Sequence, residues 1–221
     1  MARKRSHKRP TSMKASPNLQ KERRKSSSDK GKIRLVSYNI VYDKMEESPL
    51  LPPEVEAETE NLYNWIHNRP RKAIRYLEPL REKYPDVPLL YNWLTLAYAH
   101  AGKNEEVERL TRENYKKNPD YLFAKLNYAE RCLRRGETEK IPEIFGHNYD
   151  LRMLYPDRDA FHVSEVAGFM GIMGWYFYKT GDLDRAAMYY DILEQVDPDH
   201  PFTDRLAGLL LMAALDGLIE P

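Results

Sequence analysis

The stretch MGIMGWYFYKTGDLDRAAMYYDILEQVDP, residues 170–198, decides the fold. Two segments rich in apolar residues flank Gly181, and glycine readily takes the left-handed backbone found where helices end. Pro198 stops the second segment, because the residue before a proline is disfavoured in helical geometry. Gly174 and Ala186 are small enough to let the two segments approach closely. We therefore predict two helices packed against each other.

The same spacing recurs toward the amino terminus. Turn-compatible residues stand at Asn68, Gly102 and Gly136, 34 positions apart each time, and Pro85 and Pro119 have the same separation. A period of this length is typical of a two-helix repeat whose units bury their apolar faces against neighbours. We expect the left-handed backbone at Asn68 as well as at the glycines.

The last interval is longer. From Gly136 to Gly181 it is 45 residues, so 11 residues are added to the period. We place them around Tyr149 to Val166, as a longer loop and a lengthened helix.

These residues resemble the tetratricopeptide repeat (TPR) family. Met170-x2-Met173-Gly174-x2-Phe177 matches its first helix, and Ala186-x3-Tyr190 matches its second. The resemblance implies an all-α fold, a TPR-like helical-hairpin solenoid of about four units with a C-terminal capping helix and a disordered basic N-terminal arm. The repeats cover residues 53–200, with units at about 54–87, 88–121, 122–156 and 167–200. Large side chains are expected to fill the space between helices: Leu77, Tyr98, Phe145 and Tyr190.

Charge divides the chain into a basic arm and an acidic body. Residues 1–34 hold 13 Lys and Arg against two acidic residues, although the whole chain has a net charge of only +1. This segment contains few large apolar residues, and their burial could not offset the entropy that the chain would lose on becoming ordered. We therefore expect a disordered arm. Lys/Arg clusters of this kind bind nucleic acid or ribosomes, act as import signals, or only solubilise. The clustered residues are Arg3, Lys4, Arg5, Lys8, Arg9, Arg23, Arg24 and Lys25.

An extended linker, residues 35–52, follows the arm. Its β-branched and aromatic part, Ile33 to Tyr42, could be one short strand, but we expect no second strand to pair with it. An extended segment lying against the body is the preferred interpretation.

The end of the chain, residues 201–221, predicts a capping helix from about Thr203 to Asp216. Thr203 or Asp204 would cap its start and Gly217 would end it. Every residue from Leu206 to Leu215 is apolar or glycine, so one face should stay uncovered. We expect self-association or partner docking, as a possible homodimer, through Leu211, Met212 and Leu215, unless the Ile33–Tyr42 segment covers them.

Catalytic and metal-binding patterns are not found in this sequence. The six histidines show no metal-ligand spacing, Cys132 falls at a core position, and no glycine-rich phosphate loop occurs. No apolar run approaches the roughly 20 residues of a membrane span. We therefore expect no enzyme activity, no cofactor, no metal and no membrane span, and a soluble protein of the cytoplasm or, alternatively, the nucleus.

What remains is binding. In the TPR family the first helix of each unit lines a concave groove, so the resemblance implies a non-enzymatic adaptor or scaffold for a peptide or protein ligand. The candidate groove residues are Leu62, Asn92, Leu96, Phe123, Leu126, Asn127, Glu130, Arg134, Trp175 and Tyr178. The alternative is a nucleic-acid- or ribosome-associated factor that uses the basic arm while its repeats recruit a protein.

Overall fold

The computed structural model describes residues 38–42, 51 and 53–219. The predicted basic arm, residues 1–34, and most of the linker lie outside these residues. The described chain is mainly helical. Its elements are, in order, β1 (Asn39–Val41), α1 (Pro53–Glu56), α2 (Thr59–Asn68), α3 (Pro70–Lys83), α4 (Pro88–His100), α5 (Asn104–Lys117), α6 (Leu122–Arg135), α7 (Lys140–Ile144), α8 (Leu151–Leu154), β2 (Ala160–His162), α9 (Val163–Lys179), α10 (Leu183–Val196) and α11 (Pro201–Ile219).

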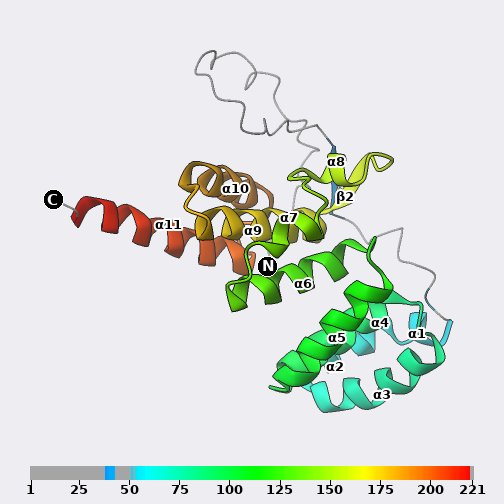
Figure 1. Ribbon diagram of the computed structural model, residues 1–221. Coiled ribbons are helices and arrows are strands. Elements are labelled where there is room, and N and C mark those ends of the chain that lie inside the picture. The colour runs from blue at the N-terminus through cyan, green and yellow to red at the C-terminus, as the bar shows by residue number, and fades with distance from the viewer. Residues whose placement is uncertain (1–37, 43–50, 52, 220–221) are drawn as a thin grey trace, which may run out of the picture. The chain divides into compact units, whose positions relative to one another are not determined.

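Successive helices pair in the order of the chain (Figure 1). α2 packs on α3, α3 on α4, α4 on α5 and α5 on α6. α3 begins at Pro70 and α5 at Asn104, 34 residues later, and the first helices α4 and α6 begin at Pro88 and Leu122, with the same offset. The predicted 34-residue spacing of the helices is confirmed for this part of the chain.

The glycine turns have the backbone that the sequence indicated. Gly102, Gly136 and Gly181 have φ of +72°, +80° and +80°, the left-handed region that glycine enters without steric cost. Asn68 does not, and the prediction of a left-handed turn there is wrong. α2 runs to Asn68, Arg69 alone joins it to α3 with φ −141°, and Pro70 starts the next helix at once.

A buried apolar core joins α1 to α5. Leu77 and Tyr98 lie in it as predicted, with Leu77 fully buried. In the last hairpin the prediction chose the wrong tyrosine. Tyr189 is fully buried and donates its hydroxyl proton to the Tyr149 carbonyl, whereas the half-buried Tyr190 bonds to Glu194 on its own helix.

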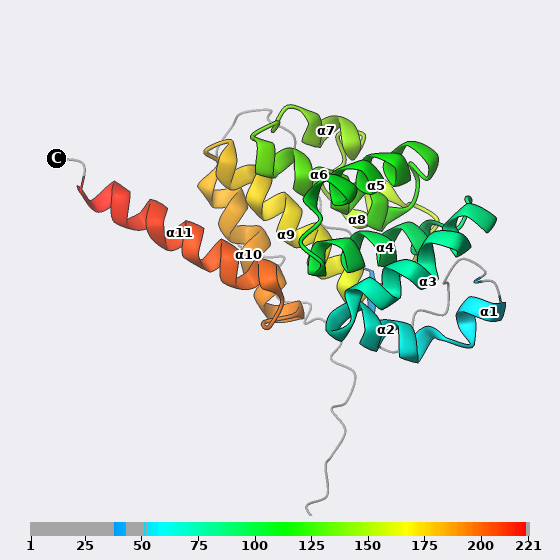
Figure 2. The same ribbon diagram turned by 90° about the horizontal axis from the view of Figure 1, so that it is seen from below.

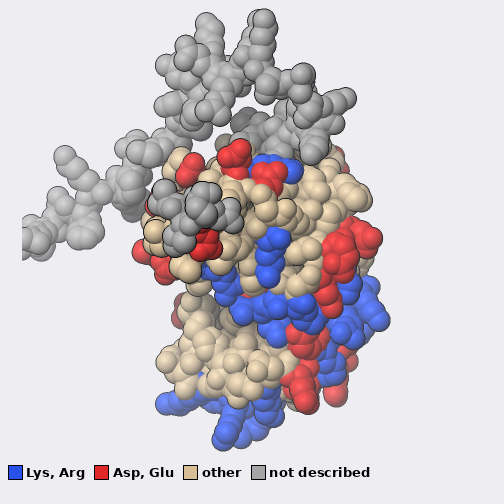
Figure 3. All heavy atoms as spheres, turned by 60° about the vertical axis from the view of Figure 1, so that its left-hand side comes forward, with Lys and Arg blue, Asp and Glu red and all other residues tan. Residues whose placement is uncertain are grey.

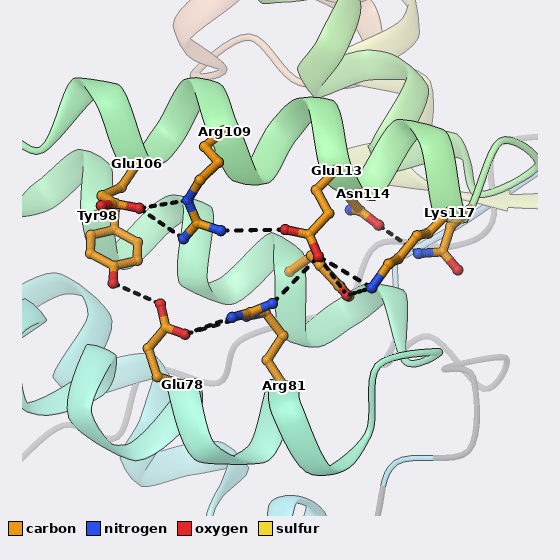
Figure 4. A network of polar contacts seen from close by, with 10 residues as sticks. Glu78, Arg81, Tyr98, Glu106, Arg109, Glu113, Asn114 and Lys117 are labelled. Carbon is orange, nitrogen blue, oxygen red and sulfur yellow. Dashed lines mark hydrogen bonds and ion pairs between the residues drawn. The ribbon is translucent and has the colours of Figure 1, made fainter.

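A polar network joins the second helices α3 and α5 beside this core (Figure 4). The Tyr98 hydroxyl donates to Glu78 at 2.7 Å, and Arg81 donates to Glu78 at 3.0 Å and to Glu113 at 3.4 Å. Lys117 also donates to the Tyr91 hydroxyl. Each cation in the network contacts a carboxylate, so opposite charges are paired and link α3 to α5.

The third hairpin departs from this regular form. α6 is followed by α7, which is only five residues long, although Ile141 and Phe145 are fully buried as predicted. Gly146 and His147 then have positive φ, which turns the chain away before another helical turn can form. The predicted extra residues follow as α8, β2 and the 17-residue α9.

The expectation that no strand pairs with the Ile33–Tyr42 segment is wrong. β1 pairs in parallel with β2, and Ile40 lies opposite Phe161. The Tyr38 ring meets the fully buried Phe161 edge-on at 5.1 Å. The described part of this segment, residues 38–42, therefore lies on the body beside the inserted residues and not across α11.

The helix α9 lies against α6, α10 and α11 (Figures 1 and 2). Two of its glycines let α11 come close. A Cβ placed on Gly171 would lie 2.4 Å from a ring carbon of Phe202, and one on Gly174 would lie 2.6 Å from Leu206. Gly174 thus has the packing role that the sequence suggested, and it lets both α10 and α11 approach α9 closely.

The last helix is longer than predicted. α11 begins at Pro201, so Thr203 lies within its first turn and donates to the Asp197 carbonyl at 2.9 Å, and the backbone stays helical through Gly217 to Ile219. The predicted cap and stop are therefore wrong, because Pro201 already supplies the helical φ at the start. None of the described helices is long and apolar enough to span a membrane.

Candidate functional site

The first helices α4 and α6 touch through the side chains that the sequence singled out. Asn127 donates an amide hydrogen bond to the side-chain oxygen of Asn92. Both residues are half-buried, as are Phe123 and Glu130, and Leu96 is 44% exposed. These residues therefore share a partly open surface, which we call the first-helix face.

Three predicted groove residues are closed off. Leu62 is fully buried, and Leu126 is 5% exposed, with its methyl group against Gly168 of α9. Trp175 is 9% exposed. They are wrong as open contact residues, because positions at which a first helix meets its neighbour are filled by core packing. Of the remaining two, Tyr178 is half-buried and Arg134 is exposed.

Trp175 is covered by cationic side chains. The guanidinium of Arg205 on α11 lies 4.5 Å from its ring, that of Arg134 on α6 lies 5.9 Å away, and the Lys179 ammonium lies 5.8 Å away. Glu130 pairs with Arg134 at 2.6 Å and with Arg205 at 3.7 Å. We call these five residues the Trp175 cluster.

The structure thus brings together Glu130, Arg134 and Trp175 from the predicted set and adds a residue that the sequence interpretation missed. Arg205 is the one basic residue between Pro201 and the end of the given sequence. The available signal was its position directly before the apolar run from Leu206 to Leu215.

His200 borders this cluster through Phe202. Its Nδ1 accepts a hydrogen bond from the backbone N–H of Phe202, and the two rings stack at 5.6 Å. The Phe202 ring in turn lies 6.3 Å from Trp175. Burial lowers the pKa of His200, although the nearby carboxylates of Asp197 and Glu130 act in the opposite direction. The neutral imidazole is therefore the form that the fold favours.

The predicted apolar face of α11 is exposed. Leu211, Met212 and Leu215 are 61%, 56% and 44% exposed. In both Figure 1 and Figure 2 the carboxyl-terminal half of α11 extends beyond α9 and α10. The Ile33–Tyr42 segment, as far as it is described, does not cover these residues.

Residues with potential for chemistry are dispersed. Cys132 is buried, and burial raises the pKa of its thiol, while Arg135 acts in the opposite direction. The His67 and His100 rings lie 4.9 Å apart and are tilted by 58°, but within the described ranges no three His, Cys, Asp or Glu side chains form a group that could hold a metal ion.

Charged side chains are grouped on the surface. In Figure 3, lysines and arginines gather in a band across one face and at its lower end, with uncharged surface between them. A hollow of about 550 Å³ lies along α5, and its described lining is a mixture of acidic and basic residues of that helix, from Glu105 to Lys116. This hollow lies on a second helix, away from the predicted groove residues.

Comparison with known proteins finds no matching family model and no matching curated protein.

Proposed function

We propose that this chain is a non-enzymatic protein-interaction module of the TPR type, with about four units in a solenoid. The 34-residue offsets of α3 from α5 and of α4 from α6 support the repeat, as do the left-handed glycines at the turns. The fourth unit, α9 with α10, repeats the arrangement after the inserted residues.

The ligand in this proposal is a segment of another protein that lies along the first-helix face. The observation that carries it is the contact of Asn127 with Asn92 across two consecutive first helices, beside the exposed Leu96. Amide groups at an open surface can bond to a peptide backbone, and an exposed leucine offers an apolar anchor.

The test uses the full chain as bait for displayed random peptides. Leu96→Lys should abolish binding of the selected peptides. Leu183→Lys is the matched control, because Leu183 is similarly exposed, at 42% against 44%, and lies on a second helix. Peptides that bind both variants as well as the wild type would contradict the assignment of the first-helix face.

A second candidate function is self-association through α11, which the exposure of Leu211, Met212 and Leu215 favours. Light scattering should show a concentration-dependent dimer for the wild type and a monomer for Leu211→Glu/Leu215→Glu. A wild type that stays monomeric at high micromolar concentration would contradict it.

The basic arm carries a third candidate, a nucleic-acid- or ribosome-associated factor whose repeats recruit a protein. The 13 Lys and Arg among residues 1–34 favour it. Binding through phosphates falls steeply with salt, so deletion of the arm should remove a salt-sensitive affinity for RNA or DNA. An RNA affinity that survives the deletion would contradict this role.

A further inference from the structure

The Trp175 cluster has an excess of positive charge. Arg134, Lys179 and Arg205 bring three cations to one ring, and Glu130 is the one carboxylate recorded in contact with them among the described residues. A surface ion pair of one cation and one carboxylate has no net charge, so it has little attraction for another anion. A group of three cations that shares one carboxylate retains the capacity to bind another anion.

Arg205 is the least satisfied member. Its shortest ion pair is 3.7 Å long, whereas every other described arginine with an ion pair has a carboxylate oxygen at 3.0 Å or closer. Its Nη1 atom is buried and makes no hydrogen bond within the described residues. The Glu130 oxygen nearest to Arg205, Oε1, also accepts hydrogen bonds from Arg134 at 2.6 Å and 3.0 Å.

Lys179 adds a cation with no recorded carboxylate partner. It is exposed at the end of α9, and no ion pair of this lysine is found in the described part of the chain. Its contact with the cluster is the one with the Trp175 ring, at 5.8 Å. A ligand carboxylate at the rim of the ring could therefore pair with Lys179 without displacing an existing ion pair of this lysine.

The ring itself is not open to stacking. Only 9% of Trp175 is exposed, and Arg205 lies over it. Proteins that bind single-stranded nucleic acid stack bases on open aromatic faces and follow the backbone with a long basic groove. A single covered ring with three cations fits one carboxylate better than a polyanion.

We propose that the Trp175 cluster binds an aspartate or glutamate side chain of the protein segment that lies on the first-helix face. This inference rests on the proposed function, since the cluster adjoins that face through Glu130 and Arg134 of α6. The carboxylate pairs with the exposed Lys179 ammonium, and the Arg134 and Arg205 guanidiniums add positive charge around the same ring. The cluster thus selects segments with an internal acidic residue.

The experiment uses the full chain and random linear peptides displayed with their carboxyl ends fused to the carrier, so that no terminal carboxylate is free. Selected peptides should be enriched in Asp or Glu at one position. Replacing that residue by Asn or Gln should weaken binding roughly tenfold or more, as should Lys179→Gln in the protein. Lys72→Gln is the matched control, because Lys72 lies over the Trp65 ring at 3.6 Å and also has no recorded ion pair among the described residues; it should bind like the wild type.

The outcomes separate this proposal from the one on which it rests. Peptides that depend on Leu96 but show no acidic preference and bind Lys179→Gln normally would overturn the cluster as a carboxylate site and leave the proposed function standing. A library that gives no peptide dependent on Leu96 would overturn both. If a poly(U) oligonucleotide displaces the peptides and also requires Lys179, the cluster is a nucleic-acid site and the proposal is wrong.

Discussion

The helices α5 and α7 follow α4 and α6 in the same way, yet α5 has 14 residues and α7 has five. We call residues 59–135 the regular segment and residues 136–162 the irregular segment. In the regular segment each second helix is long enough to bury its apolar stripe, and Arg81 of α3 and Glu108 of α5 pair with charged residues of the next hairpin. In the irregular segment α8 and β2 follow the shortened helix, and β2 pairs with β1 from the amino-terminal part of the chain. Phe145, directly after the short α7, is still buried, and its ring meets that of Phe169 on α9 edge-on at 5.5 Å, so a later helix supplies packing beside it.

The sharpest test of this comparison is Phe161→Ala in the irregular segment. Phe161 is fully buried beside Tyr38 and lies 4.3 Å from the Arg158 guanidinium, so the truncation leaves a cavity. We expect a loss of about 3–5 kcal/mol in the free energy of unfolding, measured by urea denaturation. Val41→Ala on the partly exposed side of β1 is the control and should cost less than about 1 kcal/mol. A loss below about 1 kcal/mol for Phe161→Ala would show that the irregular segment contributes little to the stability of the folded body.

A smaller effect is expected where α11 packs on α9. Gly171→Ala brings a Cβ to 2.4–2.5 Å from Phe202, including its Cβ, so α11 must shift. We expect a net loss of about 1–3 kcal/mol by urea denaturation. Gly208→Ala has nothing within 4 Å of the added Cβ, and should instead stabilise by about 0.5–1 kcal/mol through helix propensity. Equal effects of the two substitutions would show that the close approach is not limiting.

In the regular segment we expect a smaller loss from Tyr98→Phe, which removes the hydrogen bond to Glu78. Burial and the Glu78 carboxylate together raise the pKa of Tyr98 to about 12. The substitution should cost about 0.5–1.5 kcal/mol near neutral pH. It should also weaken the fall in stability between pH 10 and 12, where tyrosine in the unfolded chain ionises first. Tyr63→Phe, at a 67% exposed site, is the control.

The smallest effect is the pH dependence due to His200. Because burial lowers its pKa in the folded protein, the unfolded chain takes up a proton first as the pH falls below 6.5, and stability decreases. His200→Asn keeps an acceptor for the Phe202 N–H and cannot titrate, so its melting temperature should fall less in acid than that of the wild type. His147→Asn, at an exposed position with φ of +59°, controls for the loss of a histidine. Identical acid profiles of His200→Asn and the wild type would contradict this assignment.

Local signals predicted the parts of the fold that depend on local structure. Gly102, Gly136 and Gly181 mark turns because only a few residues near each one decide the backbone there. β2 gave no such signal, because three residues form a strand only when β1 arrives from about 120 positions earlier in the chain. The predicted turn at Asn68 was wrong because asparagine permits a left-handed backbone without requiring it.

The candidate site, like the fold, was predicted where it depends on local spacing. Helical spacing put Asn92, Asn127 and Glu130 on one surface, because consecutive first helices repeat the same geometry. Spacing within one repeat could not show that Leu62 and Leu126 are covered by their neighbours, nor that Arg205 reaches the Trp175 ring. Both facts depend on contacts between units.

The pairing of β1 with β2 has a consequence for the order of folding. The helical hairpins close contacts between neighbours in the sequence, which are fast to form. Asn39 pairs with Ala160, and the chain between them contains α1 to α8. Closing this long loop costs less entropy after those helices have packed, because packing shortens the flexible chain between the two strands. During synthesis from the amino terminus, β1 leaves the ribosome long before its partner exists. We expect Tyr38 to dock last, completing a body whose hairpins are already formed.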